Sequence, residues 1–169
     1  MEIGVIVICV VIGYFFGSIS IPRIITRIVA PGEDLESVEL PNMTTGGTFQ
    51  VKTVGATTAS MILGPKIGGL IGVLDILKGA LPTLILRLMF PDEPYFLFIG
   101  AAVVVGHIWP VYFRFRGGGG LSPAIGTMLV LDPIGILVSV FISFIIGMFI
   151  LREIKMIVLG GPIIFIFWI

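Results

Sequence analysis

Two ionisable side chains stand near the middle of a long apolar stretch of the sequence. Asp75 and Lys78 lie three positions apart in the run from 54 to 90, and residues at this spacing share one face of a helix. Ionisable groups are costly in hydrocarbon, so they usually face the interior of a helix bundle and mark a functional site. Two interpretations remain open: a structural salt bridge that fixes the register of the helix, or a lysine that binds an anionic ligand.

A second group of candidate residues surrounds the only histidine. Consecutive glycines can turn their N–H groups toward one point and bind a phosphate, particularly when a helix N-terminus follows. The four consecutive glycines of this chain are not a Walker A loop, because no Gly-Lys-Ser or Gly-Lys-Thr follows them. A lone histidine also serves as a hydrogen-bonded packing residue, and arginines beside a span often serve only to set topology. The candidates are His107, Arg114, Arg116, Gly117, Gly118, Gly119, Gly120 and Ser122.

The inventory of reactive side chains excludes several classes of chemistry. One histidine and one cysteine, Cys9, make up all the soft ligands, so we expect no disulfide, no metal site, no cofactor and no Ser-His-Asp triad. Ten basic and ten acidic residues give a formal net charge of +0. Without a basic field, we expect no nucleic-acid partner.

The composition requires lipid around the chain. Hydrophobic residues make up 57% of the 169 residues and charged residues 12%, and the mean hydropathy is +1.18. We predict an all-α, polytopic integral membrane protein with five to seven transmembrane or re-entrant helices. The length allows one membrane-embedded domain that covers residues 1–169.

The spans that position the candidate residues are separated by turn signals. The first run is predicted to be a retained helix rather than a signal peptide, because Glu2 replaces a basic n-region and no cleavage site follows. Gly13 and Gly17 in this run form a small-xxx-small pair that allows close helix packing. The run 121–131 is too short to cross a bilayer unless the glycines before it contribute, and 156–169 either stops short or is a truncated helix. The predicted apolar segments are 3–22, 54–90 with a break at Gly64-Pro65, 95–113 after the turn 91–94, 121–131, 134–151 after a break at Asp132-Pro133, and 156–169.

Polar connections suggest an orientation. The stretch from Arg23 to Lys52 is acidic and predicted to be one long loop. It falls on the same side as Arg114, Arg116 and the glycines if the N-terminus is outside, which agrees with the positive-inside rule. The turn with Asp92 then lies outside. We therefore expect a multi-pass protein of the plasma membrane with its candidate site on the cytoplasmic side.

Four ordered segments resemble the bacterial membrane acyltransferases that move an acyl chain from acyl phosphate to glycerol 3-phosphate. Gly13-Tyr-Phe-Phe-Gly-Ser-Ile19 is similar to the family's Gly-Tyr-x-x-Gly-Ser-Ile, and Val54-Gly-Ala-Thr57 to the centre of its Ser-Gly-Asn-x-Gly-Ala-Thr-Asn loop. Leu74-Asp-Ile-Leu-Lys-Gly79 matches its Asp-x-x-Lys-Gly helix. The stretch from Gly106 to Gly120 follows its Gly-His-x-x-Pro segment, which ends in Gly-Gly-Lys-Gly. Order and spacing agree over roughly the first 150 residues.

The departures from the family pattern fall on groups that bind anions. Val51-Lys52-Thr53 stands where the family has Ser-Gly-Asn, and Thr58 and Met61 replace an asparagine and an arginine. Gly119 takes the place of the lysine in Gly-Gly-Lys-Gly, and the C-terminal run lacks the family's polar His and Asn segment.

The resemblance implies a reaction and a set of site residues. It implies acyl transfer from acyl phosphate to glycerol 3-phosphate, which gives lysophosphatidate within a lipid membrane. Lys78 and His107 would be the catalytic residues. Substrate and phosphate would be bound by Ser18, Gly55, Thr57, Arg114, Arg116, Gly117, Gly118, Gly119, Gly120 and Ser122.

Two other functions remain open. The replaced residues favour a catalytically impaired or altered-substrate paralogue, which binds an acyl or phosphorylated lipid and assists an active acyltransferase. A small transporter would need a polar path through the bilayer, and only Asp75 and Lys78 offer one.

Overall fold

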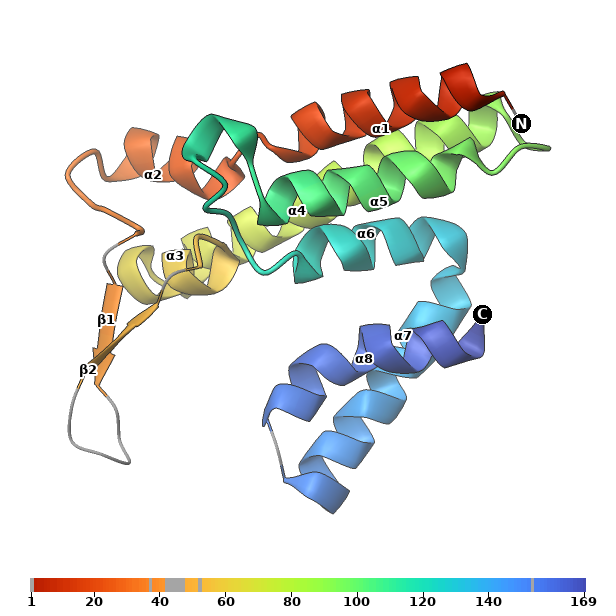
Figure 1. The fold of residues 1–169 in the computed structure, drawn as a ribbon. Coiled ribbons are helices and arrows are strands. Elements are labelled where there is room, and N and C mark those ends of the chain that lie inside the picture. The colour runs from red at the N-terminus through yellow and green to blue at the C-terminus, as the bar shows by residue number, and fades with distance from the viewer. Residues whose placement is uncertain (1, 37, 42–47, 52, 153) are drawn as a thin grey trace.

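The described residues form a helical bundle with one short β-hairpin, seen as a ribbon in Figure 1. The structure is a computed structural model, and it describes residues 2–36, 38–41, 48–51, 53–152 and 154–169. The elements are α1 (Ile3–Gly17), α2 (Ile21–Val29), β1 (Val38–Pro41), β2 (Thr48–Val51), α3 (Ala56–Leu63), α4 (Pro65–Met89), α5 (Tyr95–Ile108), the 3₁₀ turn η1 (Val111–Phe113), α6 (Leu121–Leu131), α7 (Pro133–Ile145), its π-helical continuation η2 (Ile146–Leu151) and α8 (Ile154–Trp168).

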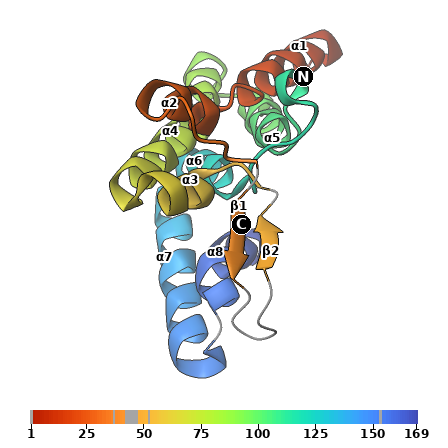
Figure 2. The ribbon, with the colours of Figure 1, turned by 90° about the vertical axis from the view of Figure 1, so that its left-hand side faces the viewer.

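The helices are arranged in two groups. Helices α1, α4, α5 and α6 lie side by side, and α7 and α8 form a separate pair that follows α6 (Figure 1). The view turned by 90° shows this pair and the hairpin on the same side of the four-helix group (Figure 2). The most extensive helix contacts join α1 to α5, α4 to α6, and α7 to α8.

The all-α membrane prediction is confirmed. In the part of the chain that the structure describes, four helical stretches are long and apolar enough to cross a membrane. Two shorter apolar helices accompany them, Leu121–Leu131 and Leu159–Trp168. The four long stretches are Ile3–Val29, Pro65–Met89, Tyr95–Phe113 and Pro133–Leu151.

Most of the predicted breaks are confirmed. Gly64, at a φ of 88° that favours glycine, separates α3 from α4. The turn before Tyr95 and the break at Asp132 lie where the turn residues placed them. Helix α6 has the predicted limits and takes Gly120 only as its N-cap, so the preceding glycines do not lengthen it.

The predicted loop from Arg23 to Lys52 is wrong over its first part, which is helical, and over its later part, where β1 and β2 pair as a hairpin. Arg23 and Arg27 lie in α2, which follows a break after α1. Ile21 and Ile25 are four residues apart and pack against the same buried cluster, so they form the apolar face of a helix. The basic residues on the other face obscured this signal. Lys52 lies outside the described residues.

Glycines bring the helices of the main group into close contact. A Cβ at Gly17 would overlap the carbonyl of Val103 in α5, and a Cβ at Gly13 would lie 2.7 Å from the Ile99 oxygen. The predicted packing role of this pair is confirmed. Helices α4 and α6 approach in the same way, because a Cβ at Gly79 would overlap the backbone of Pro123.

Asp132 connects the two helices of the second group. Its Oδ1 accepts hydrogen bonds from the N–H groups of Ile134 (3.1 Å) and Gly135 (2.9 Å) at the start of α7. Its Oδ2 accepts one from Trp168 Nε1 at the end of α8, at 2.9 Å. The Gly135 N–H and the Trp168 side chain hold the pKa of Asp132 below its usual value, because these donors favour the charged form.

We predict that Asp132→Ala lowers the melting temperature of the protein in detergent at neutral pH, because α7 loses its cap and α8 loses its tie to α7. Since the folded state depresses this pKa, the stabilisation is present above the unfolded value of about 3.9 and is lost as the pH falls through the folded value. The difference from wild type should therefore shrink in acid. Asp92→Ala, in an exposed turn, is the matched control and should leave the melting temperature unchanged. Equal melting of Asp132→Ala and wild type at pH 7 would contradict the capping role.

Candidate functional site

Three buried ionisable residues meet where α1, α4 and α5 come together. Lys78 Nζ lies 3.2 Å from Asp75 Oδ1 and 3.0 Å from His107 Nδ1. Asp75 Oδ1 is also 3.5 Å from His107 Nδ1. The exposed fractions are 1% for Asp75, 4% for Lys78 and 7% for His107. The predicted salt bridge on one face of α4 is present, and it includes the histidine as a third member.

The end of α1 supplies further partners for Lys78. The ammonium donates hydrogen bonds to the carbonyl oxygens of Gly17 (3.1 Å) and Ile19 (3.0 Å). The Gly17 carbonyl is available because the last carbonyls of a helix have no intrahelical partner, and Ile19 lies in the non-helical connection between α1 and α2. The motif that begins at Gly13 therefore contributes backbone acceptors, which its side chains did not indicate.

The glycine turn packs directly on His107. The Gly118 N–H donates to the His107 carbonyl at 3.1 Å, and a Cβ at Gly118 would overlap His107 Nε2. Only glycine fits this position without moving the imidazole. The Val54 N–H donates to the Gly117 oxygen at 3.0 Å, which joins the turn to the segment that precedes α3.

A cavity of about 220 Å³ opens beside this cluster. It lies at the N-termini of both α3 and α6, whose first residues line it. Helix N-termini present unpaired N–H groups and positive dipole ends, so they favour an anion. The lining residues are Thr53, Gly55, Ala56, Thr57, Thr58, Asp75, His107, Gly119, Gly120, Leu121, Ser122 and Leu159.

The structure brings together one part of the predicted site. The predicted residues that line the cavity are His107, Gly55, Thr57, Gly119, Gly120 and Ser122. Gly117 and Gly118 support the wall of the cavity through their contacts with His107 and Val54. Asp75 also lines the cavity; the sequence marked it only as the partner of Lys78, and it did not mark Thr53 or Thr58 as site residues. Thr58 Oγ1 donates to the Thr53 carbonyl at 2.5 Å and so closes the turn before α3.

The other predicted residues lie away from the cavity lining. Lys78 lies behind His107, and direct contact with a phosphate would break its present hydrogen bonds. Ser18 is buried and donates to the Tyr14 carbonyl at 2.8 Å. Arg114 is exposed, and the side chain of Arg116 is 72% exposed and lies 3.8 Å from Glu36. The expectation that Arg116 and Lys78 converge with the glycines on one cavity is therefore not met by this arrangement.

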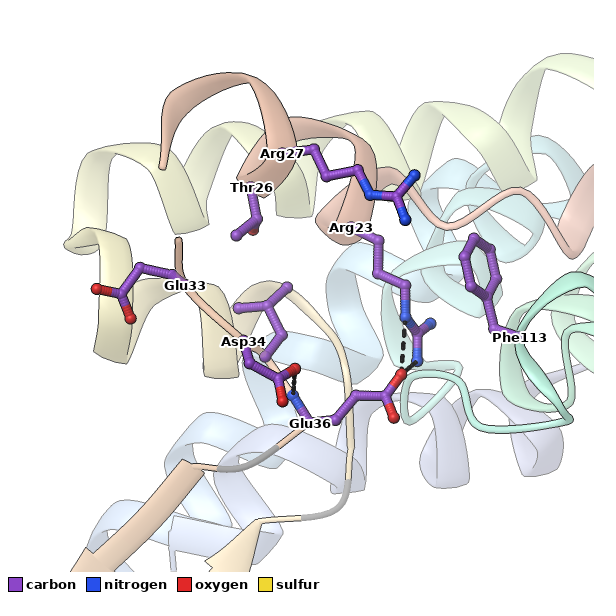
Figure 3. A pocket seen from close by; sticks show the side chains of 8 residues that line it. Arg23, Thr26, Arg27, Glu33, Asp34, Glu36 and Phe113 are labelled. Atoms are coloured by element: carbon purple, nitrogen blue, oxygen red, sulfur yellow. Dashed lines mark hydrogen bonds and ion pairs between the residues drawn. The ribbon is translucent and has the colours of Figure 1, made fainter. Parts of the chain in front are cut away.

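Arg23 restrains the glycine turn from outside. Figure 3 shows its guanidinium between Glu36 and Phe113. One nitrogen lies 2.7 Å from Glu36 Oε1 and donates to the Arg116 carbonyl at 2.7 Å. The guanidinium carbon stands 4.4 Å from the centre of the Phe113 ring, within cation–π range.

The turn needs such a restraint because two of its residues are strained. Arg114 and Phe115 have positive φ angles of 51° and 61°, a conformation that costs a non-glycine residue roughly 1–2 kcal/mol. The hydrogen bond from Arg23 falls on the next residue, immediately before Gly117. We infer that Arg23 holds the turn in the position where Gly118 meets His107.

No group of three His, Cys, Asp or Glu side chains in the described segments lies close enough to hold a metal ion. The residues that line the cavity supply backbone amides, hydroxyls, one imidazole and one carboxylate. Such a set can bind and orient an anion by hydrogen bonds.

Comparison with known proteins gives consistent matches. A family model described as "Glycerol-3-phosphate acyltransferase" matches residues 7–169. A glycerol-3-phosphate acyltransferase of Myxococcus xanthus is 37% identical over 125 residues, which cover 73% of this chain and 59% of that protein. One of Aquifex aeolicus is also 37% identical, over 73% of this chain and 58% of its own length. The chain thus spans less than two thirds of these relatives.

Two solved structures resemble the fold. The crystal structure of PlsY (YgiH), an integral membrane glycerol 3-phosphate acyltransferase, in its glycerol 3-phosphate form has a TM-score of 0.74 at 31% identity, and the match covers 96% of this chain and 75% of that one. The lysophosphatidic acid form has a TM-score of 0.63 at 26% identity, over 96% and 86% of the two chains.

We predict that Arg23→Gln increases hydrogen exchange at the Gly118 and Val54 amides by about tenfold or more, because a charge-assisted hydrogen bond contributes roughly 1.5–3 kcal/mol. Hydrogen–deuterium exchange of the purified protein in lipid nanodiscs measures this directly. Arg27→Gln is the matched control. Arg27 lies one turn along α2 and has no hydrogen bond or ion pair with any residue that the structure describes. Unchanged exchange in Arg23→Gln would show that the turn does not depend on Arg23.

Proposed function

This chain belongs to the glycerol-3-phosphate acyltransferase family, and we propose that it transfers an acyl chain from acyl phosphate to glycerol 3-phosphate. The product would be lysophosphatidate, a precursor of phospholipids. The observation that supports this proposal best is the cavity at the N-termini of α3 and α6, beside His107. Three of the four motif segments that resemble the family contribute residues to it.

The size and lining of the cavity suit the acceptor. At about 220 Å³ it is smaller than the roughly 300–1,000 Å³ of drug-sized ligand sites, which fits a small phosphorylated molecule better than a whole lipid. The amides of Gly119 and Gly120 and the hydroxyls of Thr57 and Ser122 would bind the phosphate of glycerol 3-phosphate.

The acyl chain of the donor would lie against the membrane face. An apolar groove of about 520 Å³ runs between α5, α6 and α8. Its walls include Leu97, Val104, Met128 and Phe165, which provide the apolar contacts that a hydrocarbon chain requires. The phosphate end of the donor would then reach the polar end of the bundle.

The chemistry needs no covalent intermediate. Acyl phosphate is already activated, so the acceptor hydroxyl oxygen attacks the acyl carbon, a new ester C–O bond forms, and the C–O bond to phosphate breaks. The departing phosphate carries away the electron pair and takes up the hydroxyl proton. His107 would orient an oxygen of one substrate, and the helix amides would stabilise the negative charge that develops.

The residues that differ from the family pattern are expected to lower the rate of acyl transfer. The helix N-termini at the cavity and His107 are in place. Gly119, however, stands where the family pattern has a lysine, so the cation of that lysine is missing. A Cβ at Gly119 meets nothing within 4 Å, so a lysine at this position has room beside the cavity. We therefore propose an active but slow enzyme.

We predict that Gly119→Lys increases kcat/KM for glycerol 3-phosphate by about ten- to a hundredfold, since a charge-assisted hydrogen bond to phosphate contributes roughly 1.5–3 kcal/mol. Transfer is measured with purified protein in nanodiscs, acyl phosphate and radiolabelled glycerol 3-phosphate. Gly32→Lys, at another glycine with open space around it, is the matched control and should not change the rate. Absence of transfer by both wild type and Gly119→Lys would favour the impaired paralogue that assists another acyltransferase.

The polar end of the bundle is proposed to face the cytoplasm. Arg23, Arg116 and the glycine turn lie together at one end. The opposite end holds the N-terminus and the turn before α5, because the Glu2 N–H donates to the Tyr95 hydroxyl at 2.9 Å. The positive-inside rule assigns the end with the arginines to the cytoplasm, so we propose a plasma-membrane protein with its N-terminus outside.

For this topology, we predict that a membrane-impermeant maleimide labels a cysteine at Asp92 in intact cells, in a background with Cys9→Ser. A cysteine at Gly119 should react only after permeabilisation, because it lies at the opposite end of the bundle. Both positions are exposed in the structure, so a difference in labelling reports the side of the membrane and not burial in the protein. The reverse pattern would invert the proposed orientation.

A further inference from the structure

The only histidine of the chain has its two ring nitrogens in different surroundings. Nδ1 faces Lys78 and Asp75, at 3.0 Å from Nζ and 3.5 Å from Oδ1. Nε2 lies against Gly118, at the wall of the cavity. In a neutral imidazole one nitrogen donates and the other accepts, and the hydrogen bond at one nitrogen decides the state of the other.

The hydrogen bonds of Lys78 decide which nitrogen carries the proton. An ammonium has three N–H donors, and Nζ has four neighbours within 3.2 Å. Two of the donors point to the Gly17 and Ile19 carbonyls. His107 Nδ1 lies 3.0 Å from Nζ, whereas Asp75 Oδ1 lies 3.2 Å away as an ion-pair partner outside good hydrogen-bond geometry. We therefore assign the third donor to His107 Nδ1.

The opposite tautomer fits these surroundings poorly. A proton on Nδ1 would face the Lys78 ammonium and leave the third lysine N–H without an acceptor. It could not reach Asp75 well, because 3.5 Å is longer than a normal N–H···O hydrogen bond of about 2.7–3.2 Å.

We propose that Lys78 is a positioning residue. It does not contact the ligand itself, and it fixes His107 as the neutral tautomer with its proton on Nε2. His107 then donates a hydrogen bond from Nε2 to an oxygen of a phosphate-bearing ligand in the cavity. The imidazole cannot act as a general base through Nε2, because that nitrogen already carries a proton. The tautomer rests on the geometry alone, whereas its consequence for acyl transfer rests on the function proposed above.

The consequence agrees with the chemistry of the reaction. The leaving phosphate can take up the hydroxyl proton, so a histidine base is not required. A neutral donor at Nε2 stabilises negative charge on a substrate oxygen without repelling the positive helix ends around the cavity. Lys78 thus acts on the substrate through His107.

The tautomer can be measured directly because the chain contains one histidine. In protein labelled with ¹⁵N-histidine, couplings to the ring C–H groups distinguish Nδ1 from Nε2, and the nitrogen shifts show which one is protonated. Wild type should show a protonated Nε2 and an accepting Nδ1. A protonated Nδ1 in wild type would overturn the proposal.

Variants test the role of Lys78. In Lys78→Met the proton should move to Nδ1, because Asp75 becomes the only polar side chain beside that nitrogen. Lys66→Met, an exposed lysine on the same helix, is the matched control and should keep the wild-type tautomer. Asp75→Asn retains the lysine donor and should also keep the wild-type tautomer. This variant provides a test if Lys78→Met does not fold. A change of tautomer in Asp75→Asn, or none in folded Lys78→Met, would contradict the proposal.

A second pair of variants tests the donor at Nε2. The glutamine amide of His107→Gln places an N–H near the position of Nε2, so transfer should stay within about tenfold of wild type if donation is the role. His107→Asn places its amide nearer Nδ1 and should lose about a hundredfold or more, the usual contribution of a transition-state donor. Equal loss in both variants would overturn the donor role of Nε2. The NMR result stands even if the protein shows no transfer, so failure of the reaction and failure of the tautomer are distinguishable.

Discussion

The buried ammonium of Lys78 is the interaction on which the arrangement of the site depends. A cation in the middle of an apolar bundle is tolerated only when its donors and its charge are satisfied. The carbonyls of Gly17, at the end of α1, and of Ile19, in the connection to α2, accept from the ammonium, and Asp75 supplies the opposite charge one turn away on α4. The lysine therefore joins α1, α4 and α5 and fixes the position of His107 between them.

In the phosphate site that we propose, backbone groups take the part that charged side chains usually have. Helices α3 and α6 begin at the same cavity, and the glycine turn adds a wall without side chains. Amides of this kind are held in place by the fold and do not need to reorganise when an anion enters. Such amides lack a full positive charge, and Gly119, where a Cβ meets nothing within 4 Å, has room for a cation.

The turn that carries the glycines is restrained from both sides. His107 and Val54 bind it from the inside, and Arg23 binds it from the outside. The strained residues Arg114 and Phe115 could not hold their positive φ angles without such contacts. In this way α2, which contributes no residue to the cavity, still determines the shape of the cavity wall.

The membrane character, most helix limits and the motifs could be predicted from the sequence, because hydropathy, turn residues and i, i+3 spacing are local properties of the chain. The sequence also placed Asp75 beside Lys78 and found six of the residues that line the cavity. The position of Lys78 against His107 and the end of α1, the position of Arg116 outside the cavity, and the contact of Arg23 in α2 with the glycine turn became known only from the folded structure. These contacts join residues far apart in the chain, such as Lys78 with Gly17 and Arg23 with Arg116. Their partners are mostly backbone carbonyls, which every residue carries and no sequence pattern can distinguish.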